Sequence, residues 1–559
     1  MRGDRQLIFI PIVALVAVSP LILKGPSSGH DFEFHMRNWL EVSSQWKQGV
    51  ILPHWDFTAA WNSGEPRFVF YPPLSWSIGA LLGLMLPWGA VPTTFIFLAL
   101  LGCGLTMNRL TCEWASSSNA LIAAAFYMVQ PYLLFTFYER AAYAELLAAA
   151  WIPLLILGVL RPRLTIAGIA IPICLLWLTN DPAAVMGSYA LGLLGVTRVA
   201  YAYRNTRDSR RALKDAINIG AGETLGIGLA GFYVLPATIE QHWVQINMPF
   251  LRGVRYQDNF FFGSIGDPSH DVILRTASLC GVALLVVAGV SFAVAFRSLS
   301  QDRKMSSVQS SEQKFSLFAL AVLACFSAFL LTSASAVLWR HLPELRFLQF
   351  PWRFCAILGA TTAALFALAI SRSSPRPAVA MVIACALTLS FTLGGNRLFR
   401  QACYPNVSIQ GQVAGFYHGG QYDPTDEYTP VGAKALALQH SNPASWIADR
   451  PTDPAPKTGA DDYSVAMARR LHFDVSSLVP RFLVVSLRDY PAWKISVNGA
   501  PVANLPHRPD GLIVIPIPSG RSKIDIAYSH TPDQVAGWII TALSTALLFF
   551  FARKMEGSR

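Results

Sequence analysis

The sequence GHDFEFHMR at residues 29–37 anchors the interpretation of the whole chain, because it places a dense polar cluster directly after an apolar run at residues 7–23. Within eight positions it holds five ionisable residues: His30, Asp31, Glu33, His35 and Arg37. Only 14% of the chain is charged, so the cluster is unusual. Ionisable groups near a bilayer are costly, which makes a functional site the default interpretation. A solvated loop beside the membrane is the alternative.

The composition defines the class of protein. The chain has 559 residues, of which 53% are hydrophobic, and a mean hydropathy of +0.40. Its apolar residues come in runs of about 18 to 22, the length of membrane-spanning helices. The net charge of +11 does not indicate nucleic acid, because the basic residues lie in short loops between apolar runs. Seven of the eight cysteines lie in or beside such runs, so neither a disulfide framework nor a zinc site is expected.

The apolar runs predict an α-helical polytopic membrane protein with about 12 spans. The predicted spans are residues 7–23, 91–108, 118–137, 143–160, 164–179, 183–201, 216–236, 272–296, 316–337, 353–371, 377–395 and 534–552. Arg2 and Arg5 precede the first run and no cleavage site follows it, which predicts an uncleaved helix and a cytoplasmic N-terminus. Basic loops then alternate with the spans, so both termini are expected in the cytoplasm.

The same alternation brings several polar segments to the outer side of the membrane. These are the first outer loop at 24–90 and residues 139–145, 180–181, 239–271 and 341–353. They therefore face the cluster at residues 29–37. Within the first outer loop, residues 71–87 are apolar but bounded by prolines and short for a span. We expect them to form a helix that lies at the outer surface or re-enters it.

Residues 396–533 lack long apolar runs and are rich in Pro, Gly, Asp and Ser, which predicts a soluble extracytoplasmic domain. Asn498-Gly499 follows an alternating run, and this pair is the strongest short signal for a tight hairpin, because both turn residues need positive φ. We expect a small antiparallel β domain, a sandwich, tethered by the last helix. The predicted domains are therefore 1–395, 396–533, and 534–559 as the final transmembrane helix and cytoplasmic tail.

Three outer clusters carry the residues that could do chemistry. In the first, Asp31 is a candidate general base, and His35 lies one helical turn beyond it and would share its face. In the second, Arg140 and Tyr143 would share a helical face, with Glu145 nearby, and the arginine is a natural partner for a lipid phosphate. An Arg–Glu pair that only fixes a helix end is the alternative for this cluster.

The third cluster surrounds Arg353, which begins an apolar run. An unpaired cation is expensive at that position unless an anion meets it. The neighbouring Trp352 is interpreted as an ordinary interfacial anchor.

Several motifs resemble known bacterial membrane proteins. They are Gly29–Asp31 with His35 and Arg37, the Gly49, Pro53 and Trp55 spacing, Phe68–Leu74, Arg140–Glu145 and Gln349–Phe354. Together these resemble the multi-spanning proteins labelled 6-pyruvoyl-tetrahydropterin synthase-related, although nothing here resembles that soluble enzyme. Asp426–Pro430 and Tyr490–Gly499 further resemble YfhO-type membrane proteins. Both groups are similar to GT-C glycosyltransferases.

The resemblance implies a set of site residues. In the GT-C class an acidic residue of the first outer loop acts on the acceptor, and later acidic residues help bind metal or substrate. Asp31 matches the first role by position, and Glu145 is the nearest match to the second, so the implied catalytic residues are Asp31, His35 and Glu145. The implied substrate-binding residues are His30, Arg37, Tyr71, Arg140, Tyr143 and Arg353. A divalent ion, Mg²⁺ or Mn²⁺, would bind Asp31 and Glu145, but the second cluster lacks an Asp-x-Asp pair.

Three hypotheses follow for the function. The first is a GT-C-like glycosyltransferase that moves a sugar from a polyprenyl-phosphate donor to an extracytoplasmic glycan, lipid or protein acceptor, surrounded by membrane lipids. The second is a transporter or flippase of lipid-linked saccharide, although transporters often show similar halves and none are visible here. The third is a non-catalytic envelope assembly protein, for which neutralising Asp31 would have little effect.

Overall fold

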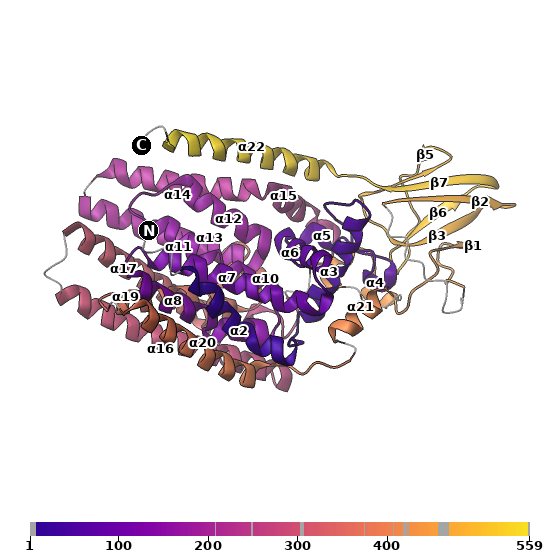
Figure 1. The fold of residues 1–559 in the computed structure, drawn as a ribbon. Helices are drawn as coiled ribbons and strands as arrows, with labels where there is room; N and C mark the ends of the chain where they lie inside the picture. Colours follow the sequence, from indigo (N-terminus) through magenta and orange to yellow (C-terminus); the bar gives the residue numbers. More distant parts are fainter. Residues whose placement is uncertain are drawn as a thin grey trace.

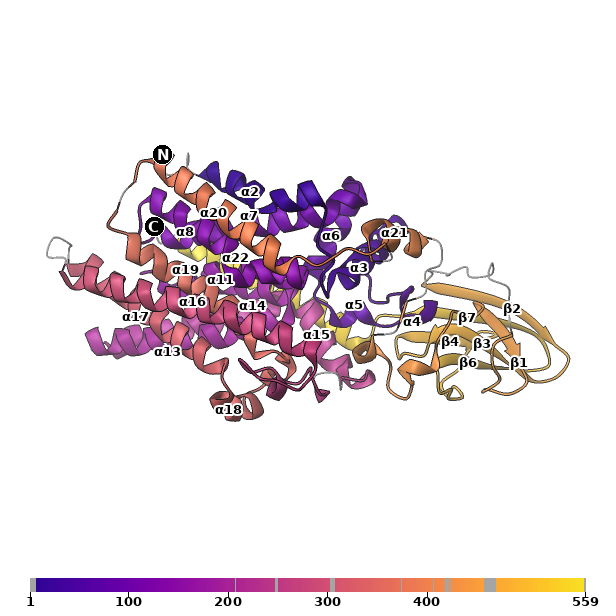
Figure 2. The same cartoon turned by 90° about the horizontal axis from the view of Figure 1, so that it is seen from below.

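The computed structural model describes residues 7–206, 208–246, 250–301, 307–373, 375–405, 407–417, 422–423, 425–456 and 469–556. A long bundle of helices carries a β domain at one end (Figures 1 and 2). The helix α2 begins, and the last helix α22 ends, toward the end of the bundle that is remote from the β domain (Figures 1 and 2). Arg2 and Arg5, which orient the first span in the sequence argument, lie outside the described residues.

The bundle is built from mostly apolar helices that range from 4 to 34 residues in length. In the first half they are α2 (Phe9–Lys24), α7 (Val91–Thr111), α8 (Ser117–Val129), α9 (Pro131–Leu134), α10 (Tyr143–Ala149), α11 (Ile152–Leu160), α12 (Ile166–Thr179) and α13 (Asp181–Thr206). In the second half they are α14 (Ser209–Leu229), α15 (Gly231–Glu240), α16 (Pro268–Gln301), α17 (Ser307–Leu330), α19 (Cys355–Ile370), α20 (Pro377–Phe399) and α22 (Pro532–Glu556). These helices make the chain a multi-pass membrane protein.

The predicted count of twelve spans is not confirmed. Among the described residues, eight helices are long and apolar enough to cross a membrane, or ten if each of two bent pairs is one span. One pair bends by 41° before Pro131, which cannot donate a backbone hydrogen bond, and the other bends by 78° before Gly231. The remaining two expected spans correspond to α2 and α12, which have 16 and 14 residues. At 1.5 Å per residue, α12 is about 21 Å long and shorter than a typical hydrocarbon core.

The first outer loop folds into four helices between the bundle and the β domain. They are α3 (Phe32–Lys47), α4 (Ala59–Asn62), α5 (Arg67–Phe70) and α6 (Pro73–Met85). The last of these has 13 residues and begins with Pro73, as expected of a short helix in the range 71–87. Its length of about 20 Å is too short to span the hydrocarbon region unaided. On the same side of the bundle lies α21 (Ile409–Tyr417), beside α3, whereas α18 (Ala336–His341) lies along the flank of the bundle (Figure 2).

The predicted antiparallel β domain is confirmed. One sheet has the order β1-β3-β6 (Ser445–Ala448, Arg481–Arg488, Leu512–Ile517) and the other β2-β7-β4-β5 (Arg470–Ser477, Gly520–Tyr528, Trp493–Val497, Ala500–Pro501). Buried residues of both sheets, such as Ile515 and Ile526, share one hydrophobic core, so the sheets form a sandwich. Asn498 and Gly499 connect β4 to β5 with φ values of 52° and 80°, which is the predicted tight turn.

Candidate active site

The loop that carries Asp31 is fixed by close backbone contact with the second outer cluster. The backbone N–H of Asp31 donates to the carbonyl of Arg140 at 2.8 Å. A Cβ at Gly29 would lie 2.6 Å from the carbonyl carbon of Arg140, so only glycine allows this approach. Asp31 occupies the residue before α3, and its side chain is 46% exposed. The carboxylate is therefore held in place by its backbone while its oxygens stay accessible.

Two arginines and one glutamate form a buried charge cluster beside Asp31. Arg140 donates from Nη1 to Glu145 Oε2 at 2.8 Å, and its Nη2 lies 3.9 Å from Asp31 Oδ2. The Nε of Arg353 lies 3.7 Å from the same Glu145 oxygen and is buried without a hydrogen-bond partner among the described residues. Tyr132 donates to the other oxygen of Glu145 at 2.5 Å. One carboxylate thus holds two guanidinium groups near Asp31.

These residues line one cavity of about 630 Å³. Its walls include the predicted site residues Asp31, His35, Tyr71, Arg140, Glu145 and Arg353. Polar groups that were not predicted as site residues also line it, including Asp181, Tyr233, Glu344, Gln349 and Glu427. The cavity therefore joins the outer segments that the sequence placed on one side of the membrane. Figures 1 and 2 show that the elements around it lie at the end of the bundle next to the β domain.

His35 and Tyr143 act together as a support for the cavity wall. The side chain of His35 is only 2% exposed, and its Nε2 accepts a hydrogen bond from the backbone N–H of Tyr143 at 3.2 Å. Burial lowers the pKa of His35 to about 4, so the imidazole is neutral at pH 7. The ring of Tyr143 packs 5.3 Å from that of His35 and 5.4 Å from that of Trp39, and it does not line the cavity. This contact gives His35 a positioning role and places Tyr143 behind it.

The predicted residues His30 and Arg37 are not part of the cavity lining. Arg37 pairs with Glu33 one helical turn earlier, and its guanidinium lies 3.7 Å from the centre of the Tyr422 ring. Glu33 also accepts from Gln412 at 3.1 Å, so this group joins α3 to α21. His30 is exposed at the start of the loop. His35 and Arg37 are two residues apart on α3 and diverge by about 200°, which turns Arg37 away from the cavity that His35 lines.

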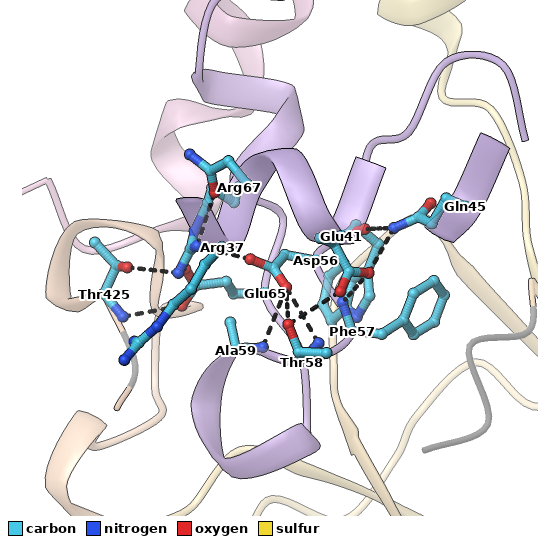
Figure 3. A network of polar contacts seen from close by, with 12 residues as sticks. Arg37, Glu41, Gln45, Asp56, Phe57, Thr58, Ala59, Glu65, Arg67 and Thr425 are labelled. Carbon is cyan, nitrogen blue, oxygen red and sulfur yellow. Dashed lines mark hydrogen bonds and ion pairs between the residues drawn. The ribbon is translucent and has the colours of Figure 1, made fainter. Parts of the chain in front are cut away.

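A second charge cluster in the first outer loop was not predicted from the sequence. Figure 3 shows Glu41, Asp56, Glu65 and Arg67 in one network that reaches Thr425. Arg67 lies 2.7 Å from Asp56 Oδ2 and 2.8 Å from Glu65 Oε1, and all three side chains are at most 4% exposed. Glu65 also accepts from the backbone N–H of Thr425 at 3.0 Å. The network fastens the segment that leads into the β domain onto the first outer loop.

The fastened segment forms part of the cavity wall. Thr425, Glu427 and Tyr428 line the cavity, and the Tyr428 ring stacks on Phe70 with centroids 6.0 Å apart. Burial raises the pKa of Glu427 above its usual range. One signal for this segment was visible in the sequence, since Asp426–Pro430 is a motif of the YfhO-type resemblance. Nothing in the sequence indicated that it would reach the residues around Asp31.

The donor set does not fit a metal ion. Both oxygens of Glu145 are engaged, by Tyr132 and by Arg140, and Arg140 also stands between Glu145 and Asp31. In the part of the chain that the structure describes, no three His, Cys, Asp or Glu residues are placed to hold a metal ion together. The predicted Mg²⁺ or Mn²⁺ at Asp31 and Glu145 stays a prediction that these positions do not support, and no step below depends on it.

No family model and no curated protein matches the chain. Similar solved structures include the arabinofuranosyltransferase AftD from Mycobacteria, with 16% identity and a TM-score of 0.40 over 69% of this chain and 26% of that one. Another is the oligosaccharyltransferase AglB from Archaeoglobus fulgidus, in complex with an inhibitory peptide and a dolichol-phosphate. It has 14% identity and a TM-score of 0.39, over 76% of this chain and 60% of that one. The chain thus spans less than two thirds of the length of either protein. At this level of likeness no family is shown, and the proposals below rest on the cavity.

Proposed function

We propose that this protein is a membrane glycosyltransferase that moves a sugar from a polyprenyl-phosphate carrier to an acceptor hydroxyl outside the cytoplasm. It would work in the inner membrane of a bacterium, with both termini in the cytoplasm. The observation that carries the proposal is the juxtaposition of an accessible carboxylate, Asp31, with two buried guanidinium groups in one cavity. A hydroxyl acceptor needs a base, and a departing lipid phosphate needs cations.

In the proposed reaction the acceptor hydroxyl gives its proton to a carboxylate oxygen of Asp31. The acceptor oxygen forms a bond to the anomeric carbon of the sugar, and the bond from that carbon to the phosphate oxygen breaks. The electron pair of the broken bond stays on the phosphate, which Arg140 and Arg353 hold. Arginine suits this task because its planar fork of donors matches the oxygens of a phosphate.

The charge balance of the cluster favours this sequence of events. Arg140 and Arg353 carry two positive charges, and Glu145 and Asp31 carry two negative charges. When Asp31 takes the proton, its negative charge disappears 3.9 Å from Arg140. At the same stage a new negative charge develops on the departing phosphate. The cluster therefore stays balanced through the reaction, and the fixed arginines stabilise the developing charge without reorganisation.

The test is sugar transfer in membranes that contain matched amounts of each variant. Polyprenyl-phosphate sugars that accumulate in cells lacking the protein identify the donor to be labelled. Asp31→Asn keeps the shape of the side chain and removes the proton acceptor, so transfer should fall by about 10²–10⁴. His35→Ala should have an intermediate effect, because His35 supports the wall through the Tyr143 backbone and does not accept the proton.

Glu33→Gln is the matched control, since Glu33 lies two residues from Asp31 but binds Arg37 and Gln412 away from the cavity. It should retain transfer activity. If Asp31→Asn kept most of the activity while Glu33→Gln lost it, the assignment of the base would be wrong. If all variants supported normal transfer, Asp31 would not be the base and the transport and assembly hypotheses would gain. If no polyprenyl-phosphate sugar accumulated without the protein, the enzyme and transport hypotheses would both give way to the assembly hypothesis.

A further inference from the structure

One wall of the cavity holds polar atoms that have no partner and no part in the proposed proton transfer. Trp177 of α12 and Asp181 of α13 both line it. The Trp177 Nε1 and the Asp181 Oδ1 are buried, and neither has a hydrogen-bond partner among the described residues. A buried donor or acceptor without a partner costs about 1–3 kcal/mol. We therefore expect a ligand at this wall that accepts a hydrogen bond from Trp177 Nε1 and donates one to Asp181 Oδ1.

Among the described residues, the donor near Asp181 Oδ2 is the hydroxyl of Tyr233 in α15, and a second acceptor competes for it. The Tyr233 hydroxyl lies 2.7 Å from Asp181 Oδ2 and also 2.7 Å from the carbonyl oxygen of Phe70. A hydroxyl has one proton, so it cannot satisfy both acceptors at once. No ion pair found among the described residues includes Asp181. The carboxyl group thus has room for donors that the described residues do not supply.

Aromatic rings surround this polar wall. Tyr71, Phe70 and Tyr428 line the cavity together with Trp177 and Tyr233. Tyr71 lies near enough to interact electrostatically with Asp31 and Arg353 and also with Asp181 and Glu427. Tyr71 is therefore close both to the charge cluster of the proposed reaction and to the Trp177–Asp181 wall of the same cavity. A molecule whose phosphate rests on the arginines would extend past Tyr71 to that wall.

We propose that Trp177, Asp181 and Tyr233 form the subsite for the transferred sugar, and that this sugar is uncharged. The inference deepens the proposed function and rests on it. Sugar hydroxyls both donate and accept, so one hydroxyl donates to the Asp181 oxygen and another accepts from the Trp177 N–H. The faces of a sugar ring are apolar and pack against aromatic rings. A sugar that carries a carboxylate is disfavoured, because the unpartnered Asp181 oxygen needs a donor, and a carboxylate offers only acceptors where a neutral sugar has a hydroxyl.

The experiment measures binding of three lipids to the purified full-length protein in detergent. The probes are undecaprenyl phosphate, the same lipid carrying a neutral hexose, and the same lipid carrying a uronic acid. In the native protein the lipid that carries the neutral hexose should bind about 10–100-fold more tightly than undecaprenyl phosphate alone. The lipid that carries the uronic acid should bind no more tightly than undecaprenyl phosphate alone. Asp181→Asn should leave binding of the bare phosphate unchanged and bring the affinities for hexose and uronic acid within about threefold of each other.

Asp267→Asn is the control, because Asp267 caps the start of α16 outside the cavity lining and asparagine caps equally well. It should not change the preference between the two sugars. Trp177→Phe is the second variant and should reduce the increment for the neutral hexose while keeping the apolar ring, which tests the subsite even if Asp181→Asn does not fold.

The outcomes separate the two proposals. If undecaprenyl phosphate binds but the neutral hexose adds nothing, or if the uronic acid binds as well as the hexose to the native protein, the subsite is overturned while the proposed function stands. A change of sugar preference in Asp267→Asn would also overturn the subsite. If none of the three lipids binds, the proposed function itself fails, and the subsite fails with it.

Discussion

Glu41→Gln should make the protein more stable at neutral pH, although Glu41 is fully buried in the network of Figure 3. Its Oε1 accepts from Gln45 at 2.8 Å and from the backbone N–H of Phe57 at 3.1 Å. Its Oε2 lies 3.0 Å from the Thr58 hydroxyl, which is also 3.0 Å from Asp56 Oδ1. The Thr58 hydroxyl has one proton and cannot donate to both carboxyl groups. If Glu41 is protonated, Glu41 donates to Thr58, and Thr58 donates to Asp56. A glutamine at position 41 can make the same hydrogen bonds, because its amide NH₂ donates to Thr58 without the uptake of a proton.

The size and sign of the effect follow from the proton that Glu41 holds. Burial, reinforced by the neighbouring Asp56 carboxylate, raises the pKa of Glu41 from 4.5 to about 8. The folded protein keeps the proton up to that pH, whereas the unfolded chain releases it above 4.5. Stability is therefore lost as pH rises between these values, by about 1.4 kcal/mol per pH unit. Glutamine has no such dependence, so the advantage of Glu41→Gln should grow by about 3 kcal/mol between pH 5 and pH 7.

Chemical denaturation of the purified protein in detergent, followed by tryptophan fluorescence at several pH values, measures this difference. Comparing the variant with the native protein at each pH cancels the other titrating groups. Glu65→Gln is the control and should destabilise the protein at every pH. Both oxygens of Glu65 accept hydrogen bonds, one from Arg67 and one from the Thr425 N–H, and an amide NH₂ in place of either oxygen cannot accept. An advantage of Glu41→Gln that stayed constant from pH 5 to pH 8 would refute the assignment of a neutral Glu41.

Three further predictions concern the turn, the loop contact and the topology. Gly499→Val should cost about 1–2 kcal/mol through backbone strain alone, because no atom lies within 4 Å of the added Cβ, and unchanged proteolysis of the β domain would contradict it. Gly29→Ala should lower sugar transfer by pushing the first outer loop off the Arg140 backbone, and normal transfer would show that the loop can shift. The exposed Cys403 should be labelled from outside intact cells, whereas a cysteine at Ser209 should not, and equal labelling would reverse the topology.

The sequence by itself determined the features that depend on local interactions. Apolar runs reveal membrane helices, because the thickness of the hydrocarbon core sets the length of a run and that length can be counted in the sequence alone. The Asn498-Gly499 turn was predictable because positive φ is a property of the two residues themselves. The polar cluster after the first run was also visible, and Asp31 does line the cavity. The number of spans was not predictable, since the bends before Pro131 and Gly231 depend on how the helices pack.

Only the tertiary structure decided which charges are buried and what they contact. Glu41, Asp56, Glu65 and Arg67 resemble a solvated loop in the sequence, yet the β domain covers them and the chain segment at Thr425 completes their hydrogen bonds. His35 is a positioning residue because its partner is a backbone N–H 108 residues away. Asp181 lies in the cavity wall beside Tyr233, which is 52 residues further along the chain. Burial and pairing are properties of the assembled fold, because they depend on distances between residues that the order of the sequence does not contain.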